Sequence, residues 1–205
     1  MQPVLQLTNV SVSFETPYGE VEAVRDVSWS LNPGEVLAIV GESGCGKTVM
    51  VQSIMKLLPK NSKLKQGEIV VDGQDITHYK ERKMRKLRAN AFSMVFQDPM
   101  SSLNPTIPIG KQMVEAIKKH NKISTDEAKK LMRMVEIDDV EERFHLQPHF
   151  FSGGMRQRCV LAMALASEPK VIFADEPTTA LDVTVQAKIL KLIRELKEKT
   201  GVSFV

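Results

Sequence analysis

The residues with the clearest chemical meaning in this chain are eight consecutive ones, Gly41, Glu42, Ser43, Gly44, Cys45, Gly46, Lys47 and Thr48. They fit the phosphate-binding pattern G-x-x-x-x-G-K-[ST], in which glycines let backbone N–H groups approach phosphate oxygens closely. In this pattern the lysine, Lys47, reaches the β- and γ-phosphates of a nucleotide, and the Thr48 hydroxyl is a ligand of Mg²⁺. We therefore expect a nucleotide and Mg²⁺ to bind at this stretch.

The flanking residues predict the strand and the helix that such a loop requires. The apolar run 36–40 is long enough for one buried strand and too short for a helix. After the loop, apolar residues recur at helical spacing, and Pro59 is expected to end that helix. These apolar residues are Val51, Ile54, Met55 and Leu58. The N-terminus of the helix would add partial positive charge to the anion site.

Two carboxylates follow a second apolar run, Val171 to Ala174. Asp175, directly after this predicted strand, would hold Mg²⁺ largely through water. Glu176 comes next, where a carboxylate could polarise a water for attack on the γ-phosphate. Gln97 ends another predicted strand, 93–96, and could contact the metal or the attacking water. Taken alone, the Asp-Glu pair is as often a surface turn, and a glutamine after a strand is usually a loop residue.

A second anion site is predicted at Ser152-Gly153-Gly154, which opens an apolar helix. Free N–H groups, a serine hydroxyl and the helix dipole would all attract an anion there. The simpler interpretation is that Ser152 only caps the helix. One nucleotide needs one phosphate-binding site, so a second such site in the chain indicates contact with the nucleotide of another chain. That arrangement is a head-to-tail dimer with two shared sites, which the γ-phosphate would close.

Composition excludes several classes of protein. The chain has 205 residues, 26% of them charged and 42% hydrophobic, and a formal net charge of +3. The longest run without a polar residue, 159–166, is far shorter than the roughly 20 residues of a membrane span. We expect no secretory signal, and the two cysteines form no disulfide framework, so a reducing cytosol fits best. The basic run 80–88 is predicted to be a solvated helix face rather than a nucleic-acid site, because no aromatic residues are interleaved.

The hydrophobic pattern also predicts the order of structural elements. Residues 4–14 alternate in two registers, first Leu5 and Leu7 and then Val10, Val12 and Phe14. The first part of the chain is therefore predicted to be antiparallel β leading into α/β, with an all-helical insert between two halves of an α/β core. The chain ends at residues 201–205, which look like the beginning of a strand, so we expect a fold that is cut off.

Taken in order, these motifs resemble the ATPase subunit of ABC (ATP-binding cassette) transporters over nearly the whole chain. GESGCGKT is similar to its Walker A motif, Gln97 to its Q-loop and FSGGMRQR to its signature motif. VIFADEP is similar to Walker B with its catalytic glutamate, and Thr179 to Asp182 to the D-loop. Phe14 looks like the aromatic residue that stacks on adenine, and Tyr18 is the weaker candidate.

The resemblance implies ATP and Mg²⁺ as ligands and a P-loop NTPase (RecA-like) α/β core with an N-terminal antiparallel β-subdomain and an inserted α-helical subdomain. Residues of about 1–97 and 160–205 would form the core, and about 98–159 the helical part with the signature motif. The usual leucine-to-glutamine signature reads Phe151 to Met155 here. The family also has a switch histidine after the strand that begins near Val202, whereas the four histidines here all precede Asp175. That histidine is absent from this chain.

More narrowly, GESGCGK, FQDPMSSLNP, FSGGM and ADEPTTALDVT look like the ATPases of bacterial dipeptide and oligopeptide importers, a group that includes nickel importers. The resemblance implies two such ATPases, identical or not, beneath two membrane permease subunits, with an extracytoplasmic substrate-binding protein. The chain would then lie at the cytoplasmic face of the membrane, with its helical insert on the permeases. Two alternatives stay open: a nickel importer, and a soluble ABC-type ATPase that acts on ribosomes or DNA. A small-molecule kinase is disfavoured because it would not explain the FSGGM helix.

Overall fold

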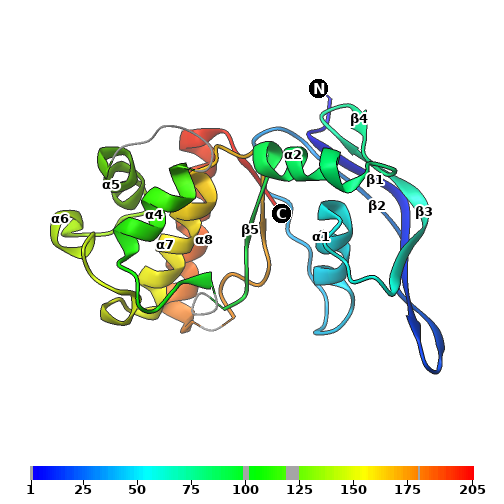
Figure 1. Cartoon of the computed structure of the whole chain (residues 1–205), viewed down its shortest axis with the longest axis horizontal. Coiled ribbons are helices and arrows are strands. Elements are labelled where there is room, and N and C mark those ends of the chain that lie inside the picture. Colours follow the sequence, from blue (N-terminus) through cyan, green and yellow to red (C-terminus); the bar gives the residue numbers. More distant parts are fainter. Residues whose placement is uncertain (1, 99–101, 119–124, 180) are drawn as a thin grey trace.

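The computed structural model describes residues 2–98, 102–118, 125–179 and 181–205 (Figure 1). Part of the FQDPMSSLNP stretch, residues 99–101, and Ala180 of the predicted D-loop lie outside the described residues. The described chain forms a four-stranded sheet in the order β2-β1-β3-β4 and a three-stranded sheet in the order β5-β6-β7. The strands are β1 Leu5–Thr16, β2 Gly19–Leu31, β3 Ser62–Val71, β4 Gln74–Asp75, β5 Phe92–Val95, β6 Val171–Ala174 and β7 Ser203–Phe204.

The first sheet is antiparallel, as the alternating pattern predicts. Along β1 the apolar residues change from odd positions, such as Leu7, to even positions, such as Val10, and the structure explains the change. Asn9 adopts a left-handed φ of 51°, and the pairing of β1 shifts register between Leu7 and Val10. This irregularity returns Val10 to the buried face that Leu7 occupies, because one extra residue reverses the side-chain alternation. Gly67 of β3 allows the close approach, since a Cβ there would lie 2.5 Å from Val10 Cα.

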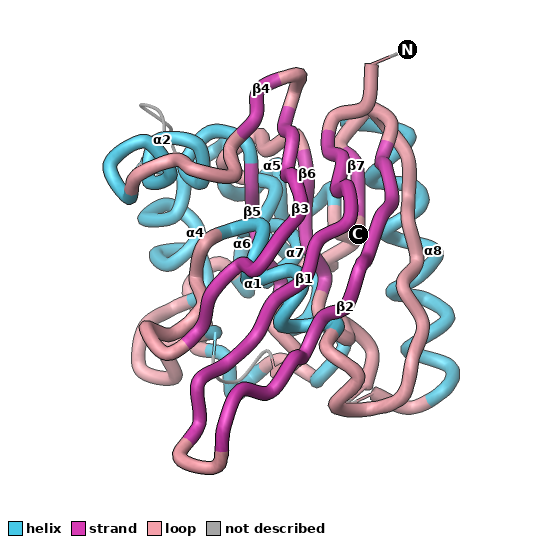
Figure 2. The backbone as a smooth tube through the Cα atoms, turned by 90° about the vertical axis from the view of Figure 1, so that its right-hand side faces the viewer, coloured by secondary structure: helices cyan, strands magenta, loops and turns pink. Residues whose placement is uncertain are grey.

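The parallel sheet separates two hydrophobic clusters, and Figures 1 and 2 show the resulting arrangement. Along β6, Val171 and Phe173 pack toward the antiparallel sheet, whereas Ile172 packs toward the other helices. Both faces are covered, which explains why β6 reads as a continuous apolar run. The helices are α1 Lys47–Met55, α2 Glu81–Ala91, α4 Ile109–Lys118, α5 Thr125–Met134, α6 Val140–Arg143, α7 Gly153–Leu165 and α8 Val183–Thr200, with a 3₁₀ turn at Pro148–Phe150. The predicted α/β class is confirmed.

Two local predictions are wrong. The run 36–40 is not a buried strand: only Val36 bridges β7, at Phe204, and Val40 is 93% exposed. Within the described chain this segment pairs along one edge only. One of its faces is also uncovered, because Val36, Ala38 and Val40 are exposed while Leu37 and Ile39 are partly buried. The helix after the loop ends at Met55 rather than near Pro59. Lys56 adopts a left-handed conformation there, and its backbone N–H donates to carbonyls of the last turn, which closes the helix early.

None of the helices in the described ranges is long and apolar enough to span a bilayer.

Candidate nucleotide site

The predicted phosphate-binding loop lies between the segment that bridges β7 and helix α1. Gly44 and Gly46 have φ values of 81° and 98°, which side chains with a Cβ rarely adopt. At Gly46 there is also no space, because a Cβ would lie 2.4 Å from the carbonyl oxygen of Ala23. Gly46 is the N-cap of α1 and has no side chain to satisfy the first N–H groups of that helix. These N–H groups therefore remain available to an anion.

Lys47 is the first residue of α1, and its ammonium turns back over the loop. Its Nζ donates to the carbonyl oxygens of Gly41 and Glu42, each at 2.9 Å. The same Nζ lies 3.8 Å from Oε1 of Glu176, which follows β6. The lysine thus connects the loop to the carboxylate of Glu176, which is distant in the sequence.

Thr48 and Asp175 are in direct contact. The Thr48 hydroxyl lies 3.0 Å from Oδ1 and 2.9 Å from Oδ2 of Asp175. The backbone N–H of Asp175 donates to Val95 O at 2.9 Å, so the pairing of β5 with β6 extends to the site. Because parallel strands end at one edge of the sheet, both carboxylates emerge beside the N-terminus of α1.

Gln97 reaches the same edge from the end of β5. Its Nε2 donates to Oε2 of Glu176 at 3.0 Å. The Thr179 hydroxyl donates to the same oxygen, also at 3.0 Å. The resemblance places Thr179 in the D-loop but does not predict its contact with Glu176. The signal that could have found it is a hydroxyl three residues after a carboxylate in a turn.

The second predicted anion site lies at the start of α7. The Ser152 hydroxyl accepts from Met155 N at 3.3 Å, so the simple capping role is present. Gly154 is required for packing, because a Cβ there would lie 2.7 Å from Cγ1 of Val185 in α8. Asp182 caps α8 in turn and accepts from Val185 N at 2.9 Å. The N-termini of α7 and α8 thus pack together. They carry the predicted residues Ser152, Gly153 and Gly154 on α7 and Asp182 on α8.

Phe14 lies near the end of β1, where it is partly buried and pairs with Val21 and Ser62. A pocket of about 410 Å³ lies beside the phosphate-binding loop, and Phe14 does not line it. Tyr18, in the β1–β2 turn, is fully exposed and does not line it either. The residues that line this pocket come mainly from β2 and from the segment between β2 and α1, and they include Val24, Val27 and Trp29 of β2 and Met50 of α1.

The two cysteines should differ sharply in reactivity. Cys45 is exposed in the loop, whereas Cys159 is buried, and burial raises the pKa of the Cys159 thiol to about 12. Because the thiolate is the nucleophile, N-ethylmaleimide at pH 8 should label Cys45 at least about 100-fold faster than Cys159. Peptide mapping of the native and denatured protein checks this, and Mg-ATP should slow the labelling of Cys45. Fast labelling of Cys159 in the native protein would contradict the burial described here.

Comparison with known proteins shows the family to which the chain belongs. Residues 24–179 match the family model described as ABC transporter. The chain is 50% identical over 207 residues to the oligopeptide transport ATP-binding protein OppD of Bacillus subtilis. It is 51% identical over 210 residues to the dipeptide transport ATP-binding protein DppD of the same species. These alignments cover 98% and 100% of this chain, which spans 58% and 63% of the two relatives.

Solved structures share the fold. The ATP-binding cassette MJ0796, in a dimeric post-hydrolysis state bound to ADP and Pi, superimposes with a TM-score of 0.81 at 28% identity, covering 98% of this chain and 86% of that one. CbiO1 of Clostridium perfringens, part of the transporter complex CbiONQ, gives a TM-score of 0.83 at 26% identity, covering 100% and 77%. The family model covers most of the chain. This chain therefore belongs to the ABC transporter family of ATP-binding cassettes.

Proposed function

We propose that this chain is the ATP-binding subunit of an importer of dipeptides or oligopeptides, and that it couples binding and hydrolysis of Mg-ATP to transport. The observation that carries the proposal is the convergence of Lys47, Thr48, Gln97, Asp175 and Glu176 at the end of β5 and β6. Peptides are proposed as the cargo because the relatives OppD and DppD are named for oligopeptide and dipeptide transport.

The donor set fits Mg²⁺ bound together with ATP. Thr48 supplies a hydroxyl oxygen, Asp175 a carboxylate and Gln97 an amide oxygen, and hard cations prefer oxygen ligands of this kind. No cluster of three or more His, Cys, Asp or Glu occurs within the described ranges, so the remaining ligands would come from phosphates and water. When bound, Mg²⁺ neutralises charge on the phosphates. When ATP binds, the Lys47 ammonium would donate to phosphate oxygens instead of to the carbonyl oxygens of Gly41 and Glu42.

Glu176 is the proposed catalytic residue, as the general base. Its carboxylate accepts a proton from water while the water oxygen bonds to the γ-phosphorus. The bond between that phosphorus and the bridging oxygen breaks, and ADP and phosphate result. Gln97 contacts Oε2 of the Glu176 carboxylate, and Lys47 lies near Oε1. The orientation of the carboxylate is therefore set before ATP binds.

A second cassette, identical or not, would complete the site. Ser152, Gly153 and Gly154 present the N-terminal N–H groups of α7, and Asp182 lies beside them at the start of α8. These groups would meet the nucleotide held by the partner in a head-to-tail dimer. The helical subdomain of about residues 98–159 would contact the permease subunits, which associate with an extracytoplasmic binding protein. The chain would be peripheral on the cytoplasmic face of the membrane.

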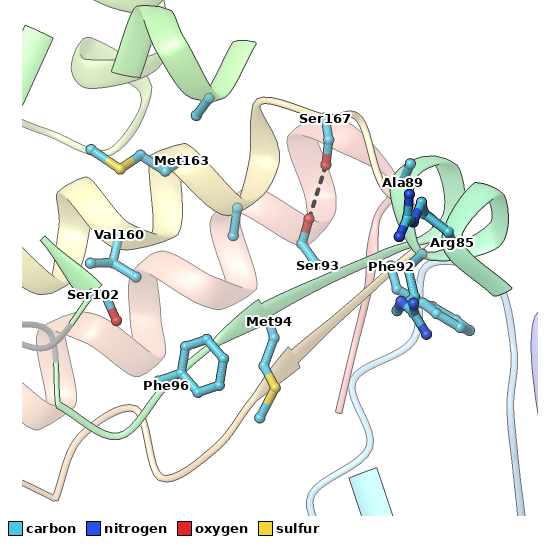
Figure 3. A pocket seen from close by; sticks show the side chains of 13 residues that line it. Arg85, Ala89, Phe92, Ser93, Met94, Phe96, Ser102, Val160, Met163 and Ser167 are labelled. Carbon is cyan, nitrogen blue, oxygen red and sulfur yellow. Dashed lines mark hydrogen bonds between the residues drawn. The ribbon is translucent and has the colours of Figure 1, made fainter. Parts of the chain in front are cut away.

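A pocket of about 970 Å³ is the proposed permease contact (Figure 3). It lies between α2, β5, α4 and α7, and its wall is mostly apolar, with Arg85 at one end. Phe96 lines it, is 48% exposed and directly precedes Gln97. A permease segment that displaced Phe96 would therefore move the residue that bonds Glu176. Met94, Val160 and Met163 belong to the apolar lining, and Met163 is the residue substituted in the test below.

The test begins with the chain carrying Glu176→Gln, purified from its own cells with Mg-ATP in mild detergent. Mass spectrometry should find two permease subunits, a second cassette and a peptide-binding protein. In this background Met163→Glu should reduce permease recovery at least tenfold, because it places an unpaired carboxylate in an apolar interface. Val21→Glu, on β2 outside the pocket, is the matched control and should leave recovery unchanged.

Two results would contradict the proposal. Recovery of ribosomal or DNA-repair proteins without membrane subunits would show that the chain is a soluble ABC-type ATPase rather than part of an importer. Equal permease recovery for Met163→Glu and Val21→Glu would remove the pocket from the interface while leaving the importer assignment intact.

A further inference from the structure

We propose that Thr179 is a positioning residue that holds the Glu176 carboxylate in its reactive orientation throughout the ATPase cycle. The proposal rests on the proposed function, because it concerns ATP hydrolysis. It assigns to the Thr179 hydroxyl a task within its own chain, distinct from the intersubunit role that resemblance to the D-loop implies for the segment 179–182.

Three side chains from different parts of the fold contact the carboxylate. Gln97, after β5, and Thr179, after β6, both donate to Oε2 at 3.0 Å. Lys47, at the start of α1, lies 3.8 Å from Oε1. The carboxylate is therefore oriented by an amide, a hydroxyl and an ammonium before any nucleotide binds.

Only one of these three contacts is independent of the nucleotide. In the proposed mechanism, Lys47 moves to phosphate oxygens and Gln97 responds to the metal and to the permease segment beside Phe96. Thr179 has neither task, and it lies in the same turn as Glu176. Its contact can therefore persist while the other two are exchanged.

The backbone supports the same conclusion. Glu176 has a left-handed φ of 47°, which is uncommon for a residue other than glycine. The backbone N–H of Thr179 donates to the carbonyl oxygen of Glu176 at 3.2 Å. This hydrogen bond closes the turn that begins at Glu176, the residue with the left-handed φ. The hydroxyl contact adds a second bond across the same turn. Backbone and side chain of Thr179 together fix the direction in which the carboxylate points.

The test uses the intact transporter complex. Thr179→Val keeps the side-chain shape but removes the donor, and it should lower kcat for ATP hydrolysis about tenfold, because a misdirected base forfeits part of its roughly 10²–10⁴-fold contribution. The ATP Kd should stay within about twofold, since the contacts of Thr179 are with Glu176 and it lies outside the phosphate-binding loop 41–48. Thr179→Ser restores the hydroxyl and should restore kcat. Thr178→Val is the matched control: it makes the same substitution at the preceding, partly buried residue, and should leave kcat unchanged.

A double-mutant comparison separates positioning from general damage. If Thr179 acts through Glu176, Thr179→Val should change single-turnover hydrolysis less than about twofold in the Glu176→Gln background. A full tenfold loss in that background, unchanged kcat for Thr179→Val, or failure of Thr179→Ser to recover would each overturn the inference. An unmodified complex that hydrolyses no ATP would overturn the proposed function as well, whereas the other outcomes leave it standing.

Discussion

Replacing Glu176 with glutamine is expected to lower kcat for ATP hydrolysis by about 10²–10⁴-fold and to leave ATP binding intact. Glutamine has nearly the same shape, and its amide oxygen can still accept from Gln97 and Thr179, which both reach Oε2 in the native protein. It cannot take a proton from water at neutral pH. The loss should therefore appear in the chemical step, measured as steady-state phosphate release by the intact complex, while the ATP Kd changes little.

Glu168→Gln provides the matched control for that substitution. Glu168 is an exposed glutamate with a left-handed φ of 48°, close to the 47° of Glu176, and it does not contact the site. The same exchange in the same backbone conformation should leave kcat unchanged. Wild-type turnover in Glu176→Gln would remove this carboxylate from the mechanism, and comparable losses in both variants would point to backbone damage rather than to chemistry.

Replacing Lys47 with alanine should raise the ATP Kd at least about 100-fold. Two interactions with phosphate oxygens would be lost, and hydrogen bonds to charged groups contribute about 1.5–3 kcal/mol each. The Lys47 side chain is only 18% exposed and already donates to Gly41 O and Glu42 O at 2.9 Å. Its ammonium is thus held over the loop before ATP binds. Isothermal titration with Mg-ATP measures the effect.

Lys60→Ala is the control for the loss of one positive charge, because Lys60 is exposed and lies in the loop after α1. Its ATP affinity should match that of the unmodified protein. Lys47→Arg should also bind ATP weakly, because the planar guanidinium does not reproduce the compact ammonium at this position. Unchanged affinity in Lys47→Ala would refute the assignment of residues 41–48 as the phosphate-binding loop.

Much of the fold could be predicted because its signals are local. The run Val171–Ala174 is apolar throughout because the strand is covered on both faces, and β6 has these same bounds. The register change along β1 is visible as a switch of apolar positions, which the irregularity at Asn9 accommodates. The segment 36–40 was mispredicted because apolar composition reports neither whether a segment pairs along its length nor whether both of its faces are covered.

The nucleotide site likewise has some features that the local sequence determines and others that depend on tertiary contacts. Residue types and order by themselves determined the phosphate-binding loop, with glycines where the backbone must be left-handed or uncrowded, and a carboxylate pair after an apolar strand. Only the tertiary structure decided that Gln97 reaches the oxygen of Glu176 that Thr179 also contacts, and that Phe96, the residue before Gln97, lines an apolar pocket. The physical reason is that loop and helix-start geometry depend on neighbours in sequence. Contacts between residues 79 positions apart depend on which strands lie side by side, and the pairing of β5 with β6 sets that.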